Sequence, residues 1–60
     1  MHKVKCVWCI WTNYGYGWEC ESEYDKGDYK EPKRTAYSDA NEYRKLGCQV
    51  EVRRKVVPLV

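Results

Sequence analysis

The chain has 60 residues with 11 basic and 9 acidic side chains, so its formal net charge is only +2. A chain of this length forms a single domain, residues 1–60, and buries too little surface to enclose a deep substrate cavity. The small charge excess argues against a dedicated nucleic-acid-binding protein, which usually carries a clear basic excess. Its aromatic residues are six Tyr and three Trp with no Phe, and both types suit half-exposed positions and interfaces.

The sequence shows no targeting or membrane-spanning segment. The N-terminal stretch MHKVKCVW lacks the long apolar region of a secretory signal, and no segment approaches the roughly 20 apolar residues of a membrane span. The C-terminal stretch VVPLV is too short to insert into a bilayer. We therefore expect a cytoplasmic protein with reduced cysteines and no membrane partner.

Residues 3–12, KVKCVWCIWT, predict a β-strand that is apolar on both faces. The even-numbered side chains share one face: Val4, Cys6, Trp8 and Ile10. The odd-numbered apolar side chains share the other face: Val7, Cys9 and Trp11. A small two-layer domain has one core, so one face should be left over, and that face is the best clue to function.

The next two segments predict a β-hairpin. Residues 13–17, NYGYG, contain two glycines and one asparagine that can adopt positive φ values. Residues 18–25 alternate between apolar and acidic side chains, which indicates a half-buried strand after a loop of about five residues. Residues 26–28, KGD, then form a turn.

The pairing register of this hairpin follows from the apolar pattern. With Thr12 opposite Trp18, Ile10 lies opposite Cys20, and the even-numbered residues form one continuous apolar face. A slip by one residue would set Trp11 against Trp18 and turn other apolar residues of the first strand against glutamates. We prefer the first register because it collects the larger apolar set on one side.

A helix and a third strand follow. Residues 29–46 carry apolar side chains at steps of three and four, which predicts a helix. Pro32 suits its first turn, where a missing N–H costs nothing, and Gly47 supplies its end. A later start with Ser38 as the N-cap is the alternative. Residues 48–57 alternate again and predict a strand.

The order ββαβ predicts an α+β domain in which one helix packs on one face of a three-stranded antiparallel sheet. The helix carries the chain back, so the third strand pairs with the first, and the sheet order is 2-1-3. The two-faced first strand then occupies the centre, where apolar residues on both faces are expected. The expected core contains Val4, Cys6, Trp8, Ile10, Trp18, Cys20, Tyr24, Ala36, Ala40, Tyr43, Leu46, Cys48, Val50 and Val52.

The four cysteines have the spacing C-x2-C-x10-C-x27-C. An all-cysteine zinc site needs four converging thiolates, and the second half lacks the C-x-x-C of a zinc ribbon. An extended chain also sends Cys6 and Cys9 to opposite faces. We therefore expect no cofactor, with Cys6, Cys20 and Cys48 as small buried apolar residues and Cys9 as a partly exposed thiol. A four-cysteine zinc-binding domain is retained as an alternative.

The sequence offers no set of residues that would support catalysis. The single histidine, His2, lies beside the start of the chain, and neither Ser22 nor Ser38 has a G-x-S-x-G context. The acidic run on the second strand is typical of a solvated face. We predict that the protein is not an enzyme.

The leftover face of the first strand predicts a protein-binding module. Its apolar stripe and the hairpin tip combine aromatic anchors with a charged rim, as interaction hot spots do. The predicted partner-binding residues are Val7, Cys9, Trp11, Tyr14, Tyr16, Arg53 and Lys55. Alternatively, the long stems of Arg53 and Lys55 lie over Trp11, or a homodimer buries the stripe.

A nucleic-acid-binding domain is the alternative function. The basic residues that could contact phosphates are Arg53, Arg54 and Lys55, with Lys30, Lys33 and Arg34 on the helix. The acidic second strand would repel a nucleic-acid backbone lying over the sheet.

In its size, its lack of catalytic groups and its exposed aromatics, the chain resembles, in a general way, small cytosolic proteins encoded by phages and mobile elements. That resemblance implies an inhibitor that acts by occupying the surface of a host factor.

Overall fold

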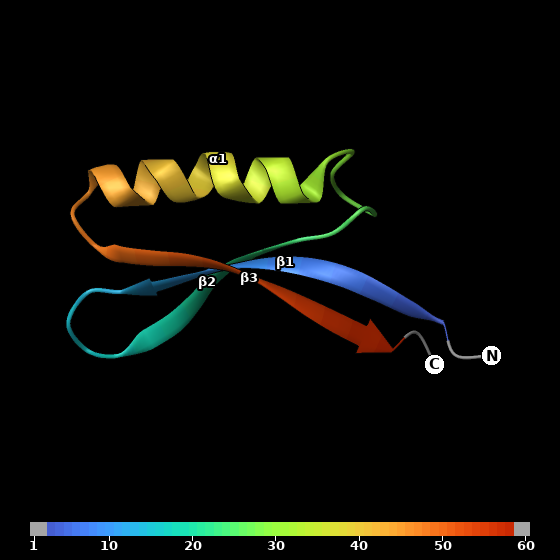
Figure 1. Ribbon diagram of the computed structural model, residues 1–60, viewed down its shortest axis with the longest axis horizontal. Coiled ribbons are helices and arrows are strands. Elements are labelled where there is room, and N and C mark those ends of the chain that lie inside the picture. Colours follow the sequence, from blue (N-terminus) through green and yellow to red (C-terminus); the bar gives the residue numbers. More distant parts are fainter. Residues whose placement is uncertain (1–2, 59–60) are drawn as a thin grey trace.

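A computed structural model describes residues 3–58, and Figure 1 shows the helix lying along one face of the sheet. The elements are β1 (Val4–Asn13), β2 (Trp18–Tyr24), α1 (Pro32–Lys45) and β3 (Gln49–Pro58). The sheet is antiparallel in the order β2-β1-β3. The predicted ββαβ order, the α+β class and the central position of the first strand are confirmed. His2 and the last two residues of the C-terminal stretch lie outside the described residues.

The bounds of α1 follow from two local signals that the sequence shows. Pro32 occupies the first helical turn, and Gly47, with a φ of 89°, ends the helix after the basic residues Arg44 and Lys45. The later start at Ser38 is therefore wrong. Within residues 3–58, no helix has the length and apolar character needed to cross a membrane.

The pairing between β1 and β2 contains a β-bulge. Ile10 pairs with Ser22, whereas the next residue of β1, Trp11, pairs with Cys20. Glu21 is therefore the extra residue of β2. Side chains alternate between the two faces of a strand, so one extra residue moves each side chain that precedes it in β2 to the opposite face of the sheet.

The bulge moves two residues out of the expected core. Trp18 pairs with Asn13, and Thr12 pairs with Glu19, so the predicted pairing of Thr12 with Trp18 is wrong. Trp18 and Cys20 share the face of the odd-numbered β1 residues and are exposed. The prediction that these two residues belong to the core is wrong because regular alternation does not continue through a bulge.

The core lies between α1 and the helix-facing side of the sheet. Its buried residues are Ile10, Tyr24, Ala36 and Ala40, with Trp8, Tyr43, Val50 and Val52 packed against them. All eight were predicted as core residues. Tyr24 is buried with its hydroxyl 2.7 Å from the Asp39 Oδ2 atom, to which it donates a hydrogen bond. Burial, with Asp39 close by, raises the pKa of Tyr24 to about 12.

Three further residues predicted in the core are exposed: Val4, Cys6 and Leu46. Val4 and Cys6 belong to the N-terminal part of β1, and Figure 1 shows the N-terminal end of this strand extending past α1. Leu46 follows the last helical residue and caps the helix at the surface. Cys48 is half-buried, and its thiol donates a hydrogen bond to the backbone carbonyl of Tyr43 at 3.3 Å.

Candidate functional site

The sheet face away from α1, called the outer face below, contains two deeply buried residues. Val7 is 5% exposed and Cys9 is 2% exposed, although the helix lies on the opposite side of the sheet. The expectation that Cys9 is a partly exposed thiol is therefore wrong. The cover over these two residues must come from side chains of the sheet itself.

Charged side chains of the neighbouring strands provide that cover. Val7 lies opposite Lys55 on β3, and Cys9 lies between Arg53 on β3 and Glu23 on β2. The Lys55 ammonium is 3.0 Å from the Glu23 carboxylate, so this ion pair crosses β1 from one edge strand to the other. The hydrogen bond from Lys55 lowers the pKa of Glu23, and the same contact raises the pKa of Lys55. The aliphatic stems of these residues take the place of a second layer.

Arg53 joins two tryptophans farther along the outer face. Its guanidinium carbon lies 5.0 Å from the ring centre of Trp11 and 5.4 Å from that of Trp18. Both distances fall in the cation–π range. The guanidinium also donates a hydrogen bond to Glu51 at 3.1 Å. We call Trp11, Trp18 and Arg53 the tryptophan–arginine cluster.

The hairpin tip carries two exposed tyrosines. Tyr16 is 95% exposed, and Tyr14 is also exposed. The loop between β1 and β2 is shaped by Asn13, whose side-chain oxygen accepts hydrogen bonds from the backbone N–H groups of Gly15 and Gly17 at 2.7 and 3.3 Å. Both glycines have φ values above 100°, which other residues rarely adopt. The tip is therefore a shaped turn that projects Tyr16 into solvent.

Tyr14 is exposed, but its neighbours Cys48 and Tyr43 place it toward the helix side of the sheet. The structure leaves four other predicted partner-binding residues accessible or half-buried on the outer face or at the hairpin tip: Trp11, Tyr16, Arg53 and Lys55. It buries the other two, Val7 and Cys9. Trp18 was missed because it was predicted in the core. The one signal that could have found it was the alternative register, which set Trp11 beside Trp18.

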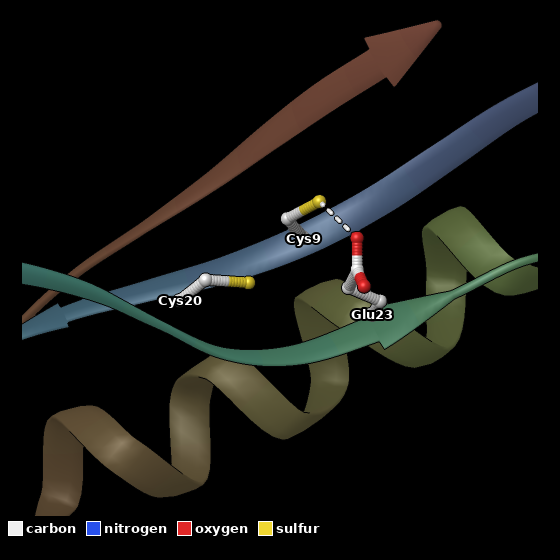
Figure 2. A group of neighbouring side chains, drawn as sticks. All are labelled: Cys9, Cys20 and Glu23. Carbon is white, nitrogen blue, oxygen red and sulfur yellow. Dashed lines mark hydrogen bonds between the residues drawn. The ribbon is translucent and has the colours of Figure 1, made fainter. Parts of the chain in front are cut away.

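Two of the four thiols meet on the outer face. The Cys9 thiol donates a weak hydrogen bond to Glu23 at 3.7 Å, and the ligand atoms of Cys9, Cys20 and Glu23 all lie within 4.8 Å of one another (Figure 2). Burial, and then the neighbouring Cys20 and Glu23, raise the pKa of Cys9 to about 11. Cys6 and Cys48 are not part of this group, so the four thiols do not converge on one point in the structure, as the alternative of a four-cysteine zinc site requires.

The basic residues of the alternative nucleic-acid hypothesis divide between the two faces of the sheet. Arg53 and Lys55 lie on the outer face, whereas Arg54 pairs with Trp8 and faces the helix side. The Lys33 ammonium also lies over the Trp8 ring, 5.4 Å from its centre. The chain therefore presents its basic groups in more than one direction.

Comparisons of this chain with protein-family models, with curated proteins and with solved structures gave no match. Functional inference therefore rests on the outer face itself. That face combines an ion-paired middle, a tryptophan–arginine cluster and an aromatic hairpin tip.

Proposed function

We propose that this chain binds a protein partner through the hairpin end of the outer face. The observation that carries the proposal is a pair of tryptophans around one arginine, together with an exposed tyrosine at the hairpin tip. Tyr16 is 95% exposed and Trp18 is 38% exposed, and Arg53 lies over the Trp18 ring. Trp, Tyr and Arg are the residue types that most often dominate the free energy of protein–protein binding.

The geometry of this surface favours binding at low entropic cost. Arg53 is held by two rings and by Glu51, and the turn that carries Tyr16 is held by Asn13. Side chains that are already ordered lose less conformational freedom when a partner binds. The proposed partner offers an apolar pocket for Tyr16, and the proposed action is occupation of the partner's surface, as in a small inhibitor of a host factor.

Single substitutions at the hairpin end test this proposal. The tagged chain is used to capture proteins from an extract of its native host, and the captured protein is then purified and titrated against each variant. We expect Tyr16→Ala and Trp18→Ala each to weaken binding by about 30-fold, because truncating a hot-spot residue costs about 2 kcal/mol or more. The matched control is Tyr37→Ala on α1, which removes a tyrosine that is 45% exposed and should leave the affinity unchanged.

Three results would contradict the proposal. Equal weakening by Tyr37→Ala would show that the effect is not local to the hairpin end. A steep loss of binding between low and moderate salt, with nucleic acid as the captured species, would favour the alternative function. An intact-complex mass that matches two copies of this chain and no other protein would assign the surface to self-association.

A further inference from the structure

Three potential metal ligands converge on the outer face from two strands. Figure 2 shows the Cys9 thiol on β1 directed toward the Glu23 carboxylate, with Cys20 on the same strand as Glu23 and its thiol directed toward the other two groups. Their ligand atoms all lie within 4.8 Å of one another. Two sulfurs and one carboxylate oxygen form a donor set that zinc accepts in proteins.

The backbone specifies this convergence. Without the bulge at Glu21, Cys20 would face α1 and could not approach Cys9. The bulge is anchored by a hydrogen bond of 3.0 Å from the Thr12 hydroxyl to the Glu21 carboxylate, and Thr12 is itself buried. Bulges that redirect a side chain are frequent beside functional sites.

The distances suit a tetrahedral ion. With bonds of about 2.3 Å to sulfur and about 2.1 Å to oxygen, neighbouring ligands of tetrahedral zinc lie about 3.6–3.8 Å apart. The separation of 3.7 Å between the Cys9 sulfur and the Glu23 carboxylate already matches this spacing. Cys20 and Glu23 are exposed, so rotation of their side chains can supply the remaining contraction of at most about 1 Å.

The charges also balance. Two thiolates and one carboxylate carry three negative charges, which a divalent cation and the Lys55 ammonium beside Glu23 would neutralise together. Cys9 would be the anchored ligand, because it is buried and its position is set by the central strand.

We propose that Cys9, Cys20 and Glu23 form a three-ligand site for a thiophilic divalent cation of the zinc class, with the fourth position open to an external ligand. The site differs from the four-cysteine arrangement, because Cys6 and Cys48 take no part in it. It also goes beyond the proposed protein-binding function, which rests on the hairpin tip and the tryptophan–arginine cluster.

Cobalt and zinc titrations of the whole reduced chain test this site. We expect one Co²⁺ per chain, with the sulfur-to-cobalt charge-transfer absorption of thiolate ligands and the visible bands of a tetrahedral site, and displacement by Zn²⁺. Competition with a chromophoric chelator then gives the zinc affinity. Cys20→Ser and Glu23→Gln should each weaken it at least about tenfold, since each removes one of three ligands.

Cys6→Ser is the matched control, because Cys6 is an exposed thiol outside the group. It should leave the zinc affinity unchanged. Far-UV circular dichroism verifies that each variant is folded, which is expected because Cys6, Cys20 and Glu23 are all exposed. The proposal is overturned if Cys6→Ser weakens binding as much as Cys20→Ser, if no charge-transfer band develops, or if one metal ion bridges two chains.

Discussion

The middle of β1 is buried on both faces, but by different means. On the inner face, Ile10 is fully buried beneath Ala36 and Ala40, two small residues that let the helix backbone approach the sheet. On the outer face, Cys9 is 2% exposed beneath the crossing pair of Lys55 and Glu23. A three-stranded sheet with one helix can therefore bury both faces of its central strand, because long charged side chains cover the face on which no helix packs.

The helix over the inner face and the ion pair over the outer face differ in how easily they are displaced. A helix is displaced only when the core opens, whereas exposed ion pairs contribute little to stability and can exchange partners. The Lys55 and Glu23 side chains are each about half-exposed, at 57% and 51%. A ligand can therefore rearrange the side chains of the outer face without unfolding the domain. This suits both the proposed protein-binding surface and the proposed metal site, which lie on that face.

Truncating one buried residue on each face of β1 should give the largest difference in the free energy of unfolding between the helix-covered face and the outer face. Ile10→Ala should reduce the free energy of unfolding by about 2–5 kcal/mol, because the rigid helix cannot collapse into the cavity. Val7→Ala on the outer face should cost only about 1–2 kcal/mol, since flexible side chains can fill the gap. Urea denaturation measures both values, and equal losses would mean that the outer cover is as rigid as the helix.

Alkaline pH should destabilise the folded chain because the buried Cys9 thiol on the outer face resists ionisation. Cys9 has a pKa of about 11 in the folded chain against 9.0 in the unfolded chain, so its stabilising contribution is complete below pH 9 and is lost as the pH rises through 11. The expected loss is about 2 kcal/mol by pH 11. In Cys9→Ala the decline should begin about one pH unit later, where Tyr24, with its pKa raised from 10.0, becomes the remaining buried group.

Denaturant titrations at successive pH values measure this loss of stability as the free energy of unfolding. The decline should be steepest between pH 9 and 11 in the unaltered chain. Identical pH profiles for the unaltered chain and Cys9→Ala would show that the thiol ionises freely and that its cover admits water.

Two substitutions of Lys55 should distinguish the contribution of its aliphatic stem from that of its ion pair with Glu23. The expected effects on the free energy of unfolding are the smallest of those predicted. Lys55→Met keeps an unbranched stem over Val7 but removes the ion pair with Glu23, and it should leave the free energy of unfolding almost unchanged because the pair is half-exposed. Lys55→Ala removes the stem as well and should lower the free energy of unfolding more than Lys55→Met does. Lys45→Ala, which breaks an exposed pair with Glu42 on α1, is the control. If Lys55→Met proves as destabilising as Lys55→Ala, the ion pair and not the stem stabilises the outer face.

The sequence by itself determined the element order, the central position of β1, the place of Pro32 in the first turn of α1 and the end of that helix before Gly47. These features depend on local signals: side-chain periodicity, Pro32 at the first turn and a positive φ at Gly47. It also indicated that Trp11 lies on the face away from the helix. Each of these conclusions needs only residues that are close together in the chain.

Only the tertiary structure decided what the outer face contains. The extra residue at Glu21 sends Trp18 and Cys20 to that face, and an alternating pattern cannot show where one residue will be left unpaired. The burial of Cys9 depends on Lys55 and Glu23, which are 32 positions apart and meet only when both edge strands flank β1. The bulge therefore brings Cys20 to the face of Cys9 and Glu23, and the contact of β1 with the distant β3 brings Arg53 to the two tryptophans.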